Sequence, residues 1–145
     1  MYKRILIPTD GTDASRRAIL AGVDFAREVG AEVVGLTTTP PFRVLSTDSE
    51  MLEDTPEQYT VSSEARARRI LADVDAAARE AGVSCRTEHA VDDDPYAAII
   101  ATAQRLGCDL IVMASHGRRG IKGLLLGSET QKVLVHSTIP VLVHR

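Results

Sequence analysis

The sequence predicts an α/β fold of three layers, in which a five-stranded, mostly parallel sheet lies between two layers of helices. Five short apolar segments alternate along the chain with four segments of helical periodicity. Such alternation is typical of parallel strands joined by right-handed crossovers. The length of 145 residues, of which 44% are hydrophobic and 26% charged, is that of one globular domain over residues 1–145.

The first elements follow directly from the pattern of apolar residues. An apolar run over residues 4–8 predicts a strand, and it ends in the turn sequence Thr9-Asp10-Gly11. The next segment places alanine and larger apolar residues at helical spacing as far as Val29. Gly30 is expected to cap this first helix. Residues 33–36 then predict a second apolar strand.

The chain changes character after the second strand. Residues 40–64 contain two adjacent prolines and six acidic residues against one arginine, with little periodicity. We expect them to form an excursion over the surface that runs into the second helix. That helix is clear from Ala67 to Ala81, and Gly82 is expected to end it. The alternation over residues 85–91 is typical of a half-exposed strand at a sheet edge.

The last third of the chain predicts two more strands and two more helices. Asp94-Pro95 should begin a short helix that Gly107 closes. The continuous apolar run over residues 110–114 predicts a central strand buried on both faces. A glycine-rich loop, a helix over about residues 128–136 and a final strand over residues 140–143 complete the chain.

Composition excludes several classes of function. The net charge of −3 and the presence of only two Phe, three Tyr and no Trp disfavour a nucleic-acid partner. No apolar run is long enough to span a membrane, so a membrane is not expected as a partner. Cys85 and Cys108 form no metal-binding or redox motif and are expected to be buried in a reducing compartment. The predicted location is the cytoplasm.

The loop after the fourth strand carries the strongest chemical signal. Glycines let backbone amides approach an anion, and a helix N-terminus offers unpaired N–H groups. Both features occur here with local cations, which makes a phosphate cradle plausible: Gly117, Arg118, Arg119, Gly120, Lys122, Gly123, Gly127 and the helix start at Ser128. The alternative is that the glycines only make turns and that Ser128 forms a capping box with Gln131.

The residues of this loop resemble a known family motif. Nucleotide-binding members of the universal stress protein family carry G-x2-G-x9-G-[ST] after the fourth strand, and this chain has Ala114-x2-Gly117-x9-Gly127-Ser128. Residues 5–11 and 140–143 also match, so the resemblance runs from end to end. It implies a Rossmann-like, adenine nucleotide alpha hydrolase-like sandwich with strand order 3-2-1-4-5 and four helices.

The resemblance also implies a ligand, which is ATP, or AMP or ADP, with Mg²⁺. The protein would be a regulatory or sensing module with at most slow hydrolysis. Adenine would lie near Pro8, Thr9, Asp10 and Thr38, with Asp10 close to the ribose or the metal. The phosphates would bind amides of Gly117, Gly127 and Ser128. The residues implied on this second side are Met113, Ala114, Gly117, Arg118, Gly127, Ser128, Glu129 and Thr130.

Two positions depart from the family pattern. Ala114 replaces the first motif glycine, which would strain the backbone if that position needed a positive φ. The second strand ends in Thr37-Thr38-Thr39, where relatives have a more apolar His-Val. This change keeps a backbone contact to adenine possible but makes the pocket more polar.

The remaining polar residues have simpler interpretations. Asp10 could serve only the turn, and the run Asp92-Asp93-Asp94 favours a solvated helix cap over a metal site. His116 could contact phosphate or solvent. The other histidines, His89, His136 and His144, are expected to be structural or exposed.

The family resemblance further implies a homodimer. The apolar terminal strand over residues 141–143 would otherwise be an exposed edge, and pairing with its copy would cover it. Two other functions stay open. One is a nucleotide-free dimeric stress protein acting through protein partners, in which Ala114 marks a decayed site. The other is an adenylating enzyme of a related α/β fold, suggested only by Asp10-Gly11-Thr12-Asp13.

Overall fold

The five apolar segments pair side by side as one parallel sheet in the computed structural model, which describes residues 1–43, 55–116 and 126–145. The strand order is β3-β2-β1-β4-β5, which confirms the predicted fold and order. The strands are β1 (Arg4–Pro8), β2 (Glu32–Thr39), β3 (Cys85–Val91), β4 (Leu110–Ala114) and β5 (Val141–His144).

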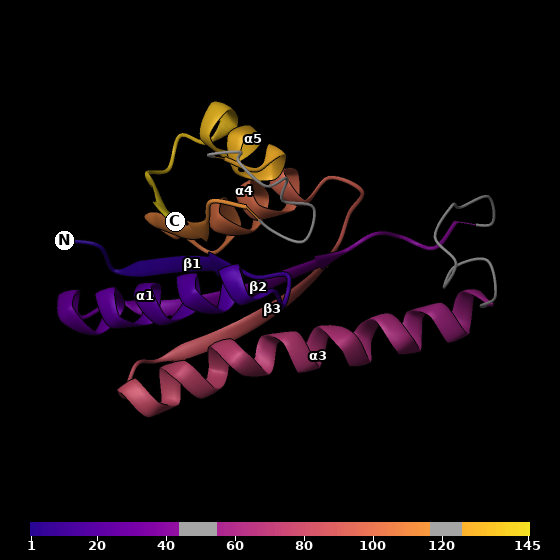
Figure 1. Cartoon of the computed structure of the whole chain (residues 1–145), viewed down its shortest axis with the longest axis horizontal. Coiled ribbons are helices and arrows are strands. Elements are labelled where there is room, and N and C mark those ends of the chain that lie inside the picture. The colour runs from indigo at the N-terminus through magenta and orange to yellow at the C-terminus, as the bar shows by residue number, and fades with distance from the viewer. Residues whose placement is uncertain (44–54, 117–125) are drawn as a thin grey trace.

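Helices cover the sheet on both faces. In Figure 1, α1 and α3 lie on one side of the strands, and α4 and α5 lie on the other. The bounds of the helices are α1 (Asp13–Val29), α3 (Pro56–Ala81), α4 (Pro95–Arg105) and α5 (Ser128–His136). Gly30 and Gly82 have left-handed backbone and end α1 and α3, as predicted.

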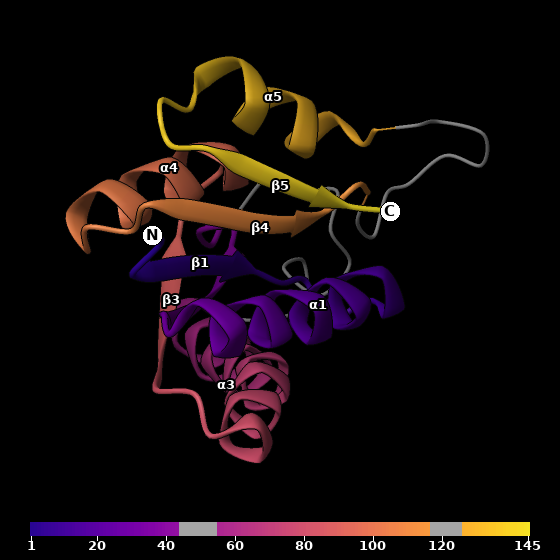
Figure 2. The same ribbon diagram turned by 90° about the vertical axis from the view of Figure 1, so that its left-hand side faces the viewer.

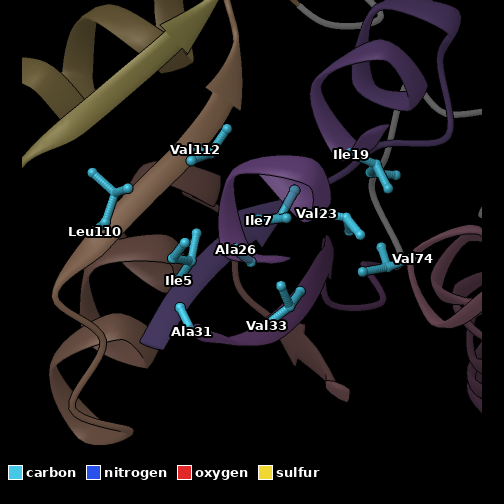
Figure 3. Close-up of a cluster of buried hydrophobic side chains, with 10 residues drawn as sticks. All are labelled: Ile5, Ile7, Ile19, Val23, Ala26, Ala31, Val33, Val74, Leu110 and Val112. Atoms are coloured by element: carbon cyan, nitrogen blue, oxygen red, sulfur yellow. The ribbon is translucent and has the colours of Figure 1, made fainter. Parts of the chain in front are cut away.

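Each face of the sheet packs its own aliphatic core. Between the sheet and α1, side chains of strands and helix point toward one another, and Val74 of α3 joins them (Figure 3). On the other face Leu6, Leu36 and Ile111 pack with Ile99 of α4 and Val133 of α5. Fully burying one such aliphatic side chain contributes roughly 1.5–3 kcal/mol. These two cores hold the strand ends in fixed positions.

The chain departs in opposite directions from the two central strands. After β1 the chain forms α1 and returns as β2, which pairs with β1 on the side away from β4. After β4 it forms α5 and returns as β5, which pairs with β4 on the side away from β1. The arrowheads of β4 and β5 point the same way (Figure 2). In open parallel sheets, ligands bind at the carboxyl ends of strands where the order reverses. In this sheet that point lies between β1 and β4.

The start of α3 differs from the prediction. The helix begins at Pro56, so residues 56–64 belong to it and not to a surface excursion. Thr55 and Gln58 form a capping box, and Pro56 occupies the first turn, where its missing N–H has no cost. Tyr59 and Ser63 are the buried residues of this part, and two polar side chains on the inner face hid the helical periodicity.

Three smaller expectations differ in outcome. Asp94 is the N-cap residue of α4 and Pro95 is its first residue, as predicted, although the Asp94 side chain makes no capping bond. The residue before α5 is Gly127, so the capping box from Ser128 to Gln131 is not formed. Cys108 is buried as expected, but Cys85 is only half-buried on the edge strand. Over the described ranges, no helix is long and apolar enough to cross a membrane.

Candidate functional site

The loop after β1 is held tightly against the end of β2. The Thr9 amide donates to the Leu36 carbonyl at 2.8 Å, and the Thr9 hydroxyl accepts from the Gly11 amide at 3.2 Å. Gly11 has a φ of +81°, and a side chain there would approach Ile70 of α3 within 3.1 Å. Only glycine therefore fits this turn without strain and without moving α3.

Asp10 organises the entrance of α1. Its Oδ1 atom accepts hydrogen bonds from the Thr12 amide at 3.0 Å, the Thr12 hydroxyl at 2.6 Å and the Ser15 hydroxyl at 2.7 Å. The Thr12 hydroxyl in turn accepts from the Ser15 amide and caps the helix. The turn function considered for Asp10 is therefore present, with three hydrogen bonds on one carboxylate oxygen.

The end of β2 is fixed from three neighbouring segments. The Thr39 hydroxyl lies 2.8 Å from His89 Nε2 on β3, and the Thr39 carbonyl accepts from the Asp92 amide at 3.0 Å. The phenol of Tyr59 on α3 donates to the Pro40 carbonyl at 2.6 Å. Burial lowers the pKa of His89, and the nearby charge of Glu64 partly offsets this shift. Thr38 is held half-buried between these contacts.

The carboxyl end of β4 accommodates Ala114 without strain. Within the described part of the chain, no residue other than glycine has a positive φ, so alanine in place of the motif glycine costs no backbone energy. The next amide, of Ser115, donates to the His144 carbonyl at 2.9 Å and extends the pairing with β5. The Ser115 hydroxyl lies 3.1 Å from Nδ1 of His116.

The start of α5 is fastened to this strand end. The Gly127 amide donates to the Ser115 carbonyl at 2.6 Å, and the Thr130 hydroxyl donates to the Ala114 carbonyl at 2.9 Å. A Cβ atom on Gly127 would lie 3.1 Å from Cα of His116. The absence of a side chain at Gly127 therefore allows the helix N-terminus to approach the strand.

The N-terminus of α5 is not capped by a side chain of the described residues. Gly127 stands at the N-cap position and Ser128 is exposed. The α1 and α3 helices, in contrast, are capped by Thr12 and Thr55. The first amides of a helix have no acceptor within it and carry its positive dipole end. This arrangement can bind an anion such as a phosphate group.

Glu129 in the same turn faces another helix. Its Oε2 atom accepts from the Tyr96 amide at the start of α4 at 2.9 Å. Its Oε1 atom lies 3.5 Å from Nζ of Lys132. Thr130 is buried and bonded to β4. The side chains of Glu129 and Thr130 thus bind backbone groups of α4 and β4. The motif alone did not indicate these contacts.

Comparison with known proteins agrees with this geometry. The model of the universal stress protein family matches residues 1–145. The chain belongs to the universal stress protein family. It is 32% identical over 149 residues to the universal stress protein YxiE of Bacillus subtilis, with all of both chains covered. It is also 32% identical over 151 residues to the universal stress protein MJ0531 of Methanocaldococcus jannaschii, covering 99% of this chain and 82% of that protein.

Solved universal stress proteins share the fold. The structure of MJ0577 from M. jannaschii superposes with a TM-score of 0.83 at 27% identity, covering 99% of this chain and 95% of the other. A universal stress protein in complex with cAMP superposes with a TM-score of 0.74 at 25% identity, covering 99% of this chain and 97% of the other.

This universal stress protein fold places the described residues of the predicted site at the carboxyl ends of the strands. Pro8, Thr9, Asp10 and Thr38 lie at or just after the carboxyl ends of β1 and β2. The second group stands at the end of β4 and the start of α5: Met113, Ala114, Gly127, Ser128, Glu129 and Thr130. Gly117 and Arg118 lie outside the described residues.

The sequence did not reveal the residues that hold the segments after β1 and β2 in place. Thr12 and Ser15 form a recognisable helix start, and their spacing could have revealed the cap. Tyr59 gave no signal, because its partner is a backbone carbonyl. No group of three or more His, Cys, Asp or Glu side chains that could hold a metal ion occurs within residues 1–43, 55–116 and 126–145.

Proposed function

We propose that this universal stress protein binds an adenine nucleotide and acts as a regulatory or sensing module in the cytoplasm. The ligand is ATP, or AMP or ADP, with Mg²⁺, and any hydrolysis is slow. The observation that carries the proposal is the start of α5, which no side chain of the described residues caps and which is fastened to the end of β4 beside the loop that follows β1. The cAMP complex of a similar universal stress protein supports a ligand of this class.

The phosphate side of the site would be the first turn of α5. The amides of Gly127 and Ser128 stand at a helix N-terminus, although the Gly127 amide already donates to Ser115. The exposed hydroxyl of Ser128 can donate to a phosphate oxygen. Gly117 and Arg118 would add an amide and a cation from the loop. A phosphate placed here gains both the open donors and the helix dipole.

The base side would be the ends of β1 and β2. Pro8 and Thr38 are half-buried, and Thr9 is held by its bond to Leu36. The few aromatic residues of the chain imply that aliphatic walls and backbone groups hold adenine. The hydroxyl of Thr38 makes this pocket more polar than one lined by valine.

Asp10 is the carboxylate proposed for Mg²⁺ or ribose. Mg²⁺ in nucleotide sites keeps several waters and uses one or two carboxylates together with the phosphates. A single carboxylate is therefore compatible with such a site, although the described residues contain no metal-binding cluster of acids. The three hydrogen bonds to Oδ1 fix the orientation of the group.

The direct test is mass spectrometry of small molecules released from freshly purified protein. We expect ATP or AMP to be recovered, and we expect Mg-ATP to raise the melting temperature of the emptied protein. Recovery of no nucleotide together with no thermal shift would contradict the proposal and favour a nucleotide-free stress protein. Multiple turnover on a small substrate would favour an adenylating enzyme.

Ser128→Ala offers a cleaner variant for this test than any change at Gly127. A side chain at Gly127 would press on the backbone of His116 and disturb the strand end itself. Ser128 is exposed and its side chain does not cap α5, so we expect the fold to stay intact without its hydroxyl. We expect weaker ATP binding by about fivefold, the value of one lost hydrogen bond of about 1 kcal/mol.

We also propose a homodimer through β5. This strand is the edge of the sheet, and its Leu142 is 38% exposed. An unpaired apolar edge tends to associate, and pairing with a second copy across a two-fold axis would cover it. Light scattering after size exclusion should give about twice the 15.6 kDa chain mass. Leu142→Lys should shift the protein to the monomer.

A further inference from the structure

We propose that Glu129 is a positioning residue that holds the phosphate-binding turn of α5 against the N-terminus of α4. This inference rests on the proposed function. The family resemblance implies that Glu129 lines the ligand, but the geometry points to a different role. Its carboxylate faces α4 and joins the first turn of α5 to the Tyr96 amide.

The first contact is a helix cap supplied from another helix. Glu129 Oε2 accepts the Tyr96 amide at 2.9 Å, and Tyr96 is the second residue of α4. Asp94, at the N-cap position of α4, makes no capping bond of its own. A carboxylate at a helix N-terminus satisfies an unpaired donor and complements the helix dipole. Glu129 therefore does for α4 what Thr12 does for α1.

Neighbouring side chains fix the direction of the carboxylate. Nζ of Lys132 lies 3.5 Å from Oε1 of Glu129 and 5.6 Å from the centre of the Tyr96 ring. The Tyr96 ring also packs on His136, with 5.2 Å between ring centres. Oε2 is thus bonded to α4, and Oε1 lies beside Lys132 of α5, whose ammonium group lies over the Tyr96 ring of α4. This matters because a carboxylate turned toward the phosphates would repel them.

Two successive residues anchor the first turn of α5 to different elements. The Thr130 hydroxyl holds it to the Ala114 carbonyl at the end of β4. Glu129 holds it to the start of α4. The Gly127 amide also donates to the Ser115 carbonyl, so two bonds hold the turn to the end of β4. The Glu129 bond adds a contact with a second element and helps to keep the amides of the turn in place for a phosphate.

The test compares ligands with and without phosphate. Adenosine, AMP and ATP are titrated calorimetrically into the wild type and into Glu129→Ala and Glu129→Gln, at a temperature where all three are folded. We expect Glu129→Ala to weaken AMP and ATP about tenfold, the value of about 1.4 kcal/mol, and to change adenosine affinity by less than about twofold. Glu129→Gln should retain affinity within about threefold, because its amide oxygen can still accept from Tyr96.

Glu57→Ala is the matched control. Glu57 is an exposed acid at the same position in the first turn of α3, so its removal changes the same charge at another helix start. We expect all three ligands to bind this variant as they bind the wild type.

Distinct outcomes would overturn the inference. An equal loss for adenosine and ATP in Glu129→Ala would show direct contact with the nucleoside. Unchanged ATP affinity in Glu129→Ala would show that the anchor is not needed. Tighter ATP binding by Glu129→Gln would show that the charge acts on the phosphates directly. A wild type that binds none of the three ligands would instead refute the proposed function, and the inference with it.

Discussion

Two helices begin at the same edge of the sheet, and their first turns are satisfied in different ways. The α1 helix is closed by its own side chains, with Thr12 as cap and Asp10 accepting three hydrogen bonds beneath it. The α5 helix begins at Ser128 with Gly127 at the N-cap position, and among the described residues no side chain caps it. Even its acidic residue, Glu129, is directed to α4.

The contrast shows how one fold separates stability from binding. Donors that are bonded within the protein contribute to folding, whereas donors left open cost little at the surface and remain available for a ligand. We therefore expect changes in the cap of α1 to act on stability and changes at the start of α5 to act on nucleotide affinity. Asp10 contributes to both, because it is also the carboxylate proposed for Mg²⁺ or ribose.

Asp10→Ala should produce the largest effect. It removes the acceptor of three hydrogen bonds, which come from the Thr12 amide and from the Thr12 and Ser15 hydroxyls. We expect the free energy of unfolding to fall by about 2 kcal/mol. Urea denaturation measures this value. A loss below about 0.5 kcal/mol would mean that the start of α1 is not closed by Asp10.

Ser128→Asp should convert the open start of α5 into a closed one. A carboxylate in the first turn interacts favourably with the helix dipole by about 0.3–1 kcal/mol, so the empty protein should be as stable as the wild type or slightly more stable. The same charge repels phosphate, and we expect ATP affinity to fall at least about tenfold. Calorimetry measures the ATP affinity, and urea denaturation measures the stability of the empty protein. Unchanged ATP affinity would place the phosphates elsewhere.

A pair of hydroxyl deletions gives a smaller and more direct comparison. Thr12→Ala removes a cap and should cost about 1 kcal/mol of stability. Ser128→Ala removes a hydroxyl that caps nothing and should change stability by less than about 0.5 kcal/mol. Both are measured by urea denaturation without ligand. Equal losses of stability in the two variants would show that the starts of α1 and α5 do not differ in this way.

The smallest effect should come from pH at the closed side of the site. Burial lowers the pKa of His89 below its usual value near 6.5, because desolvation disfavours the charged ring, and the charge of Glu64 partly offsets this shift. A pKa lowered by folding means that this contribution to stability is present above about pH 6.5 and is lost as the pH falls through the folded pKa. The wild type should therefore lose stability on acidification.

His89→Gln is the variant that isolates this effect. It should show a flatter dependence of the denaturation midpoint on pH between about 7.5 and 5.5, since its side chain does not titrate there. The ATP affinity measured at the upper pH should stay close to that of the wild type. An identical pH profile for both proteins would assign the acid sensitivity to other groups.

Much of the fold could be predicted from the sequence because local signals agreed with one another. The run over β4 showed a strand buried on both faces, and the alternation over β3 showed an edge. Glycines marked the ends of α1 and α3. The start of α3 was missed because its inner face there carries Tyr59 and Ser63, so apolar periodicity gave no signal.

The candidate site was predictable as a set of positions but not as a set of contacts. The motif located the end of β4 and the start of α5, and turn chemistry located Asp10. Which way each side chain faces depends on partners far along the chain, as with Glu129 and the Tyr96 amide, 33 positions apart. Sequence spacing within one element cannot contain that information.

The length of α3 has a mechanical consequence. The helix is 26 residues long, or about 39 Å, whereas the eight residues of β2 span about 26 Å. Its inner end is seated where Val74 packs on Gly35, and Thr55 lies about 29 Å further along the axis. A tilt of roughly 5° at that seat would move the Thr55 end by about 2.5 Å. The Thr55 end of α3 is therefore the part that such a tilt would displace most, and the bond from the Tyr59 hydroxyl to the Pro40 carbonyl ties this part to the chain after β2.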